Sequence, residues 1–236
     1  MPALRYTPAV TSQRDARRGT FITIEGPEGA GKTTQAERLR DRLAAAGREV
    51  VLTREPGGTS LGEAIRELLL QPARDRDHDP LADALLFNAA RAQLVRTVIR
   101  PALDRGATVI STRFADSTLA YQGFGAGLPI DGLRAVEEFA TGGLRPDRTI
   151  LLDLPAEAGL ARKHGDELTR FETAFDLAFH RRVRDGFRAL AAAEPERFIV
   201  VDGLRSPDAV AAEIAARMDQ PSRPGEPDAP VARIPG

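Results

Sequence analysis

Cysteine is missing from the 236-residue chain, and aromatic residues make up only 5% of it. Without cysteine the chain has no disulfide and no thiolate metal site. Its 33 Lys and Arg residues are balanced by 34 Asp and Glu residues, so no global positive field attracts nucleic acid. No apolar run is long enough to span a bilayer, and the first residues lack the apolar core of a secretory signal. We therefore expect a cytoplasmic protein that binds neither nucleic acid nor membrane.

The two ends of the chain differ from its middle. Residues 1–18 are polar and aperiodic, which predicts a flexible N-terminal arm. The last 16 residues carry five prolines, a composition that supports neither a helix nor a central strand. We expect one domain over residues 19–218, followed by a disordered, proline-rich tail over residues 219–236.

Short apolar, β-branched runs alternate with segments of helical spacing inside this domain. The alternation predicts βαβ units, and therefore an α/β fold with a five-stranded parallel sheet and helices on both faces. Gly47 should end the first helix, and Pro101 should kink a long helix over residues 79–106. The predicted strands are TFITIE (20–25), REVVLT (48–53), ATVIS (107–111), RTILLDL (148–154) and RFIVVDG (197–203).

The segment GPEGAGKT fits the phosphate-loop pattern G-x-x-x-x-G-K-[ST]. It follows a predicted strand and opens a predicted helix, which is the context that this loop requires. Backbone N–H groups and the helix N-terminus would bind the phosphates of ATP. Lys32 should reach the β- and γ-phosphates, and Thr33 should ligate Mg²⁺. The predicted ATP-binding residues are Gly26, Pro27, Glu28, Gly29, Ala30, Gly31, Lys32 and Thr33.

Two further segments, TREPGGT (53–59) and TRFADSTLAYQG (112–123), follow predicted strands at the edge where open α/β sheets bind ligands. Each places an arginine, Arg54 or Arg113, just past the end of its strand. Because arginine pairs with phosphate through two parallel hydrogen bonds, we expect both to clamp an acceptor phosphate.

These segments, together with LLFNAARAQ and RFE, stand in the order seen in bacterial thymidylate kinases, and the chain resembles that family over roughly residues 19–218. The resemblance implies a P-loop NTPase-type fold with a short lid. It also implies ATP-dependent phosphorylation of dTMP to dTDP in dTTP biosynthesis, with Mg²⁺. A homodimer packed through helices is implied as well.

Glu28 is unexpected inside a loop that binds anions. The resemblance implies that it faces the acceptor nucleotide near the sugar 3′-hydroxyl, from which a carboxylate can accept a hydrogen bond. A solvent-exposed side chain, or a partner for a nearby arginine, is the alternative.

Phe87 and Arg91 share one face of a predicted helix. Spacing alone favours a core position for Phe87, whereas the resemblance implies that Phe87 stacks on thymine and that Arg91 hydrogen-bonds its O4. An apolar slot for the 5-methyl group predicts that dTMP is preferred over dUMP by tens-fold to a few hundred-fold, on the order of 1–3 kcal/mol. The predicted substrate-binding residues are Arg54, Pro56, Phe87, Arg91, Arg113, Thr118, Tyr121 and Gln122.

Arg162, Lys163, His164 and Arg170 surround a polar stretch that the resemblance identifies as a lid, which closes over ATP. Family members without a basic residue at the variable loop positions, here 27–30, supply one from the lid. We therefore expect Arg170 to stabilise the transferring phosphoryl group, with Arg162 as the next candidate. A solvated run of charges is the alternative. The predicted catalytic residues are Lys32, Arg113, Arg170 and Glu28.

Two threonines depart from the family pattern. Thr112 stands where the family has Asp before the arginine, and Thr169 stands where related sequences often carry Asp. An acid at the first position commonly supports Mg²⁺, and a hydroxyl is a weaker ligand. We expect retained activity with weakened Mg²⁺ binding, with Asp116, Glu25 and Asp153 as unranked substitutes. A catalytically weakened nucleotide-binding protein, or a kinase for another nucleoside monophosphate, is the alternative.

Overall fold

The computed structural model describes residues 18–70, 79–163 and 169–219. Nearly all of the predicted arm and tail, and His164 of the predicted lid, lie outside these residues. Strands and helices alternate along the described chain, as the sequence predicts. No helix in this part of the chain combines the length and apolar character that crossing a membrane requires.

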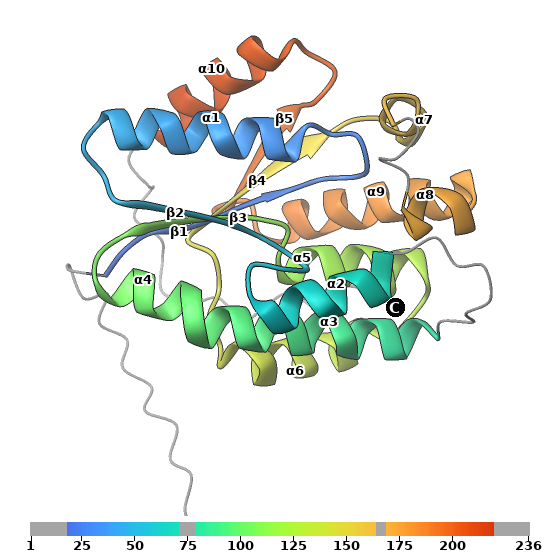
Figure 1. The fold of residues 1–236 in the computed structure, drawn as a ribbon. Helices are drawn as coiled ribbons and strands as arrows, with labels where there is room; N and C mark the ends of the chain where they lie inside the picture. Colours follow the sequence, from blue (N-terminus) through green and yellow to red (C-terminus); the bar gives the residue numbers. More distant parts are fainter. Residues whose placement is uncertain (1–17, 71–78, 164–168, 220–236) are drawn as a thin grey trace, which may run out of the picture.

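One parallel sheet runs through the described domain (Figure 1). Its strand order is β2-β3-β1-β4-β5, so β1 lies in the centre. Since neighbouring strands are parallel, their carboxyl ends meet at one edge. All five predicted strands are confirmed: β1 (Phe21–Glu25), β2 (Val50–Arg54), β3 (Thr108–Thr112), β4 (Arg148–Asp153) and β5 (Phe198–Asp202).

Helices cover both faces of the sheet, as expected. Helices α1 (Lys32–Ala45) and α10 (Pro207–Met218) lie side by side over one face, and α9 (Leu177–Ala193) packs against β4 on the other (Figure 1). The remaining helical segments described here are α2 (Ser60–Leu70), α3 (Pro80–Leu94), η1 (Val95–Ile99), α4 (Arg100–Asp104), α5 (Ala115–Thr118), η2 (Leu119–Gly125), α6 (Ile130–Thr141), α7 (Ala156–Leu160) and α8 (Arg170–Ala174).

The long helix predicted over residues 79–106 is interrupted near its proline. Asp79 caps its start by accepting hydrogen bonds from Leu81 N and Ala82 N. The α-helical α3 then changes to the π-helical η1, and α4 follows with Pro101 in its first turn. Proline lacks the N–H that continues the α-helical ladder, and a wider turn at this point accommodates the loss.

The central strand is held from both faces, and this fixes the loop that follows it. Ile22 and Ile24 are fully buried and pack with α1 and α10, while Phe21 points to the other face and meets Phe114 edge-on, with ring centroids 4.9 Å apart. Burying each of these side chains contributes about 1.5–3 kcal/mol. Glu25 lies on the same face as Phe21, because side chains alternate along a strand.

Candidate active site

The phosphate loop connects β1 to α1 and depends on glycine at two positions. Gly29 has a φ of +68°, and a Cβ there would lie 2.0 Å from the carbonyl oxygen of Gly159. Gly31 caps α1 with a φ of +84°. Other residues adopt these angles rarely, and only glycine lets the backbone approach so closely. The loop therefore leads directly into the helix N-terminus, whose positive end favours anions.

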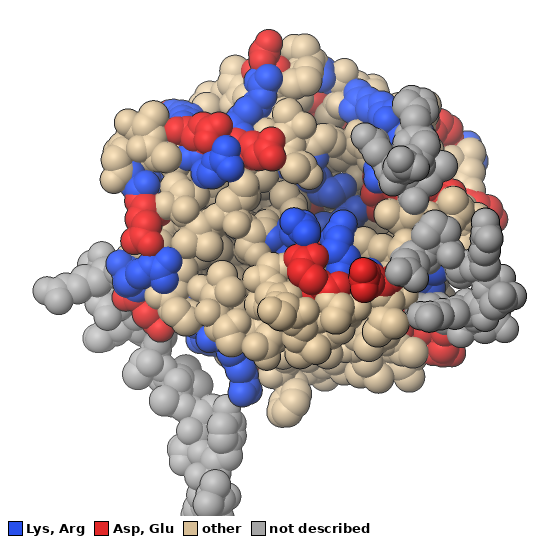
Figure 2. Space-filling model, in the orientation of Figure 1, with Lys and Arg blue, Asp and Glu red and all other residues tan. Residues whose placement is uncertain are grey.

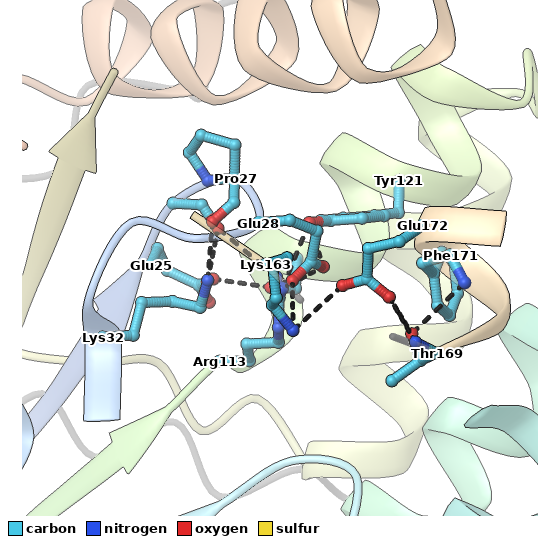
Figure 3. Close-up of polar contacts among 12 residues, drawn as sticks. Glu25, Pro27, Glu28, Lys32, Arg113, Tyr121, Lys163, Thr169, Phe171 and Glu172 are labelled. Atoms are coloured by element: carbon cyan, nitrogen blue, oxygen red, sulfur yellow. Dashed lines mark hydrogen bonds and ion pairs between the residues drawn. The ribbon is translucent and has the colours of Figure 1, made fainter. Parts of the chain in front are cut away.

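Lys32, the first residue of α1, lies over this loop. Its Nζ donates to the carbonyl oxygens of Gly26, at 3.0 Å, and Pro27, at 2.7 Å (Figure 3). Burial and the neighbouring Arg113 lower the pKa of the Lys32 ammonium to about 7, against the opposing effect of Glu28. A phosphate beside the ammonium would raise this pKa again, because an opposite charge favours the ionised form.

Glu28 points away from the loop into a cluster of charges (Figure 3). Its Oε1 accepts hydrogen bonds from Arg113 Nη2 at 2.5 Å and from the Tyr121 hydroxyl at 2.8 Å, and Lys163 Nζ lies 3.9 Å from its Oε2. Burial alone would raise the pKa of Glu28, but Arg113 and Lys32 hold it well below its ordinary value. The alternative expectation, a partner for a nearby arginine, therefore describes this conformation.

A cavity of about 110 Å³ opens beside the cluster. Every predicted substrate-binding residue except Arg54 lines it. Its wall is polar where Glu28 and Arg113 lie and apolar where Pro56 and Phe87 lie. On the face drawn in Figure 2, basic and acidic side chains gather beside one another around a hollow. The cavity thus combines charged and apolar side chains in one lining.

Arg91 is the most buried cation that lines this cavity, with a side chain only 1% exposed. Its Nε donates to Glu55 Oε2 at 2.8 Å, and its Nη1 donates to Asn88 Oδ1 at 3.1 Å. Its Nη2 donates to the Phe114 carbonyl at 3.0 Å and to Thr118 Oγ1 at 3.1 Å. So many partners fix the guanidinium in one orientation.

The aromatic wall includes one residue that the sequence interpretation missed. Phe87 lines the cavity and is partly buried, so it both packs on the core and faces the cavity. Phe171 lies 6.2 Å from Phe87 and meets Tyr121 edge-on at 5.4 Å, measured between ring centroids. A sequence signal for Phe171 exists, since it belongs to the RFE segment that contributes to the family resemblance.

Two predicted arginines lie away from the cavity, which corrects the expected placement. Arg54 is exposed and pairs with Glu63, with 3.0 Å between Nη2 and Oε2. Arg170 is buried in an ion pair with Asp83, and its Nε donates to the Leu69 carbonyl at 3.1 Å. Each guanidinium is directed by a carboxylate that the fold brings next to it, so neither faces the site in this conformation.

Other cations line the cavity or contact the phosphate loop. Arg66 of α2 and Lys163 line the cavity, and Lys163 Nζ lies 3.0 Å from Glu172 Oε1. Arg162 donates to the carbonyl of Gly29 in the phosphate loop at 3.3 Å. Arg66 is not among the predicted site residues, although its helix α2 directly follows the TREPGGT segment.

Thr169, one of the two departures from the family pattern, caps helix α8. Its Oγ1 accepts from Phe171 N at 3.2 Å, while its N–H donates to Glu172 Oε2 at 2.6 Å. This reciprocal capping box satisfies backbone donors at the helix start. The residue thus has a structural task that needs no carboxylate.

The three acids that could support Mg²⁺ in place of one at position 112, Asp116, Asp153 and Glu25, differ in their hydrogen-bond partners. Both oxygens of Asp116 accept from Arg197, at 2.6 and 2.8 Å, and both oxygens of Asp153 accept from Arg184, at 2.7 and 3.0 Å. Glu25 is instead paired with neutral donors. Across residues 18–70, 79–163 and 169–219, no group of three or more Asp, Glu or His residues is arranged to hold a metal ion.

Glu25 is the candidate acid directly before the phosphate loop. It is fully buried and accepts from Phe114 N at 2.7 Å and Ser117 Oγ at 2.6 Å. Burial, reinforced by Asp116, raises its pKa to about 7. Thr112 ends the neighbouring strand β3 and pairs in register with Ile24.

Comparisons with known proteins agree on one family. A family model described as thymidylate kinase matches residues 24–214. The thymidylate kinase of Deinococcus radiodurans is 55% identical over 203 residues, covering 86% of this chain and 97% of the relative. That of Thermomicrobium roseum is 51% identical, covering 87% and 97%. The crystal structure of thymidylate kinase from Ehrlichia chaffeensis superimposes with a TM-score of 0.70 at 33% identity, covering 86% of this chain and 99% of that one.

Proposed function

The chain belongs to the thymidylate kinase family, and on this premise we infer that it transfers the γ-phosphoryl group of ATP to dTMP, giving dTDP. The observation that carries this inference is the position of one cavity directly beside the phosphate loop, with Glu28 of the loop in its lining. The family membership does not favour a catalytically weakened protein or a kinase for another acceptor. The use of ATP by this family supports a cytoplasmic location for the protein.

The phosphate loop supplies the donor side of the site. Its residues, from Gly26 to Thr33, hold the ATP phosphates through backbone N–H groups, and Lys32 exchanges the loop carbonyls for phosphate oxygens. Because Lys32 already lies above the loop, little reorganisation is needed. A positioned ammonium then stabilises charge that develops during transfer.

On the acceptor side, Arg113 binds the phosphate of dTMP and Arg66 adds a second cation. A phosphate offers more charge and more acceptor atoms than a carboxylate, so it displaces Glu28 from Arg113. Glu28 is then free to accept a hydrogen bond from the sugar 3′-hydroxyl. Lys163 lies beside Glu28 and takes the role first expected of Arg170, stabilising the transferring phosphoryl group.

The base lies in the apolar half of the cavity. Phe87 stacks on the thymine ring, Pro56 covers the 5-methyl group, and Arg91 donates a hydrogen bond to O4. Tyr121 and Gln122 pack beside the sugar and base. The support for this arrangement is that all of these side chains line one cavity.

The oxygen atoms of Thr33 and Glu25 near the loop suit Mg²⁺, although the protein provides few such ligands. The Thr33 hydroxyl, exposed at the start of α1, would be a direct ligand, and Glu25 would support ion-bound water. Mg²⁺ usually keeps several waters and binds one or two protein groups together with phosphates. When bound, the ion neutralises charge on the phosphates. With Thr112 in place of an acid, the protein contributes less to holding it.

We further propose a homodimer that packs through α2, α3 and α6. Neighbouring contacts join α2 to α3 and α3 to α6, and the three helices lie together in Figure 1. Contiguous exposed apolar side chains mark interaction surfaces. The exposed apolar side chains on these helices are Leu61, Leu68, Leu81, Leu85 and Phe139, of which Phe139 is 88% exposed.

A coupled ADP-release assay with a panel of nucleoside monophosphates tests the function. We expect ADP release that depends on dTMP, with dTMP preferred over dUMP by about tens-fold to a few hundred-fold, because one buried methyl group gives limited discrimination. Reactions without an acceptor give the background. Binding of ATP without dTMP-dependent turnover would support the catalytically weakened alternative, and equal kcat/KM values for dTMP and dUMP would contradict the pocket assignment.

A further inference from the structure

A buried acid lies behind the arginine that is assigned to the base. Glu137 belongs to α6, and its side chain is only 8% exposed. Its Oε1 lies 3.9 Å from Arg91 Nη1, too far for a hydrogen bond but close enough for a charge interaction. Within the described part of the chain, this oxygen has no hydrogen-bond partner. A buried acceptor without a partner is costly, so its position calls for an explanation.

The donors of Arg91 can be counted. A guanidinium has five N–H groups. Nε uses one on Glu55, Nη2 uses two on Phe114 and Thr118, and Nη1 uses one on Asn88. Among the described contacts, one N–H of Nη1 is therefore uncommitted. It belongs to the nitrogen that lies 3.9 Å from Glu137. By this count it is the one Arg91 donor left for O4 of the acceptor base.

The charge of Glu137 decides how strongly it attracts this donor. Burial, reinforced by Asp116 and Glu55, raises the pKa of the Glu137 carboxyl to about 8, while Arg91 and Arg134 oppose the shift. Near neutral pH the carboxyl is mostly protonated and is a weak acceptor. Once ionised, it is a strong acceptor and adds a second negative charge beside Arg91. The other charged side chains that line the cavity of about 340 Å³ on this side of Glu137 are Glu138, Arg145, Glu194 and Arg197.

We propose that Glu137 is a positioning residue for base recognition: its carboxylate competes with the acceptor base for the one uncommitted N–H of Arg91, and so weakens dTMP binding. The proposal rests on the assignment of Arg91 to the base in the proposed function. Glu137 touches neither nucleotide; it acts on the direction of the Arg91 donor through the charge of its own carboxyl group. Affinity for dTMP therefore falls as Glu137 ionises, while the rate of phosphoryl transfer from bound dTMP stays the same.

Glu137→Gln tests this, because glutamine keeps the shape and cannot ionise. With saturating ATP, the KM for dTMP and kcat are measured from pH 7 to pH 9 in parent and variant. We expect the ratio of parent KM to variant KM to rise by up to about tenfold, since a carboxyl one unit above its pKa is mostly ionised. The kcat ratio stays flat. Titration of dTMP and of Lys32 affects both proteins alike and cancels in the ratio.

Glu138→Gln is the matched control. Glu138 is the next residue of α6, is exposed, lines the same 340 Å³ cavity and loses the same charge. Its KM profile should follow that of the parent. Glu137→Met, which keeps the length without an acceptor, should show the same flat KM as Glu137→Gln, and it serves as the test if the glutamine variant has a lowered Tm.

A KM ratio that does not change with pH would overturn the inference, and so would a pH-dependent change confined to kcat. Arg91→Lys separates this failure from failure of the proposed function. If Arg91→Lys raises the KM for dTMP many-fold while the Glu137 variants give a constant ratio, base recognition by Arg91 stands and the role of Glu137 is rejected. If Arg91→Lys leaves the KM unchanged, the assignment of Arg91 to the base fails and the inference fails with it.

Discussion

Replacing Glu28 by glutamine removes the carboxylate that pairs with Arg113 and lies 3.9 Å from Lys163. The side chains of Glu28 and Arg113 are 11% and 18% exposed, so the charges are largely desolvated. Breaking a fully buried pair costs about 3–5 kcal/mol. Glutamine still accepts from Arg113 and Tyr121, and the site is not completely dry. We therefore expect a loss of about 1–3 kcal/mol in the free energy of unfolding.

Activity should change more than stability. If Glu28 orients the sugar 3′-hydroxyl, the variant loses a hydrogen bond to a charged acceptor, worth about 1.5–3 kcal/mol, and kcat falls roughly 10- to 100-fold. The KM for ATP should stay within about twofold, because Glu28 points away from the loop carbonyls that Lys32 contacts. The KM for dTMP should not rise, since the acceptor phosphate no longer competes with a carboxylate for Arg113.

The same variant should change the dependence of stability on pH. The folded-state pKa of Glu28 lies below its ordinary value of 4.5. A depressed carboxyl pKa contributes stability that is complete above the unfolded pKa and is lost as the pH falls toward the folded value. Below about pH 4.5 the parent should therefore lose stability more steeply than Glu28→Gln. Thermal unfolding at a series of pH values measures this difference.

The matched control is Glu213→Gln. Glu213 lies on α10, away from the cavity, and its carboxylate pairs with Arg205 and Arg217. Its kinetics should equal those of the parent. Steady-state assays with dTMP and ATP varied in turn give kcat and both KM values. Parent-like kcat in Glu28→Gln would refute the reasoning, and a large rise in the KM for ATP would place Glu28 on the donor side instead.

Three further outcomes follow from the structure. Thr112→Asp should lower the Mg²⁺ concentration needed for half-maximal activity and raise kcat. If the parent is inactive even at high Mg²⁺ and Thr112→Asp restores activity, the catalytically weakened alternative is supported instead. Arg170→Ala removes the buried guanidinium that pairs with Asp83, which costs about 3–5 kcal/mol and should lower Tm by roughly 10 °C. An unchanged Tm together with a collapsed kcat would return the catalytic role to Arg170 from Lys163. Phe139→Asp places a charge in the proposed dimer interface and should give monomers in sedimentation velocity, whereas a parent that already sediments as a monomer contradicts that interface.

Local pattern was sufficient to predict the sheet and the phosphate loop. Each strand is a short apolar run flanked by turn residues, and strands that alternate with helices pair in parallel. The loop could be predicted because its glycines act locally, through backbone angles that other residues rarely adopt. Phe87 and Arg91 line the same cavity for a similarly local reason, since residues four apart share a helix face. These features depend on contacts between residues close in sequence.

The partners of long charged side chains were decided only by the tertiary structure. Arg54 belongs to the TREPGGT segment and Arg170 to the RFE segment, and both were expected to bind phosphate. Arg54 pairs instead with Glu63, and Arg170 with Asp83, which lies 87 residues before it. A flexible arginine pairs with whichever carboxylate the packing of helices brings within reach, and a buried charge must find such a partner. The position of Glu137 behind Arg91 arises in the same way, from the packing of α6 against α3. Neither helix sequence alone indicates that the other packs against it.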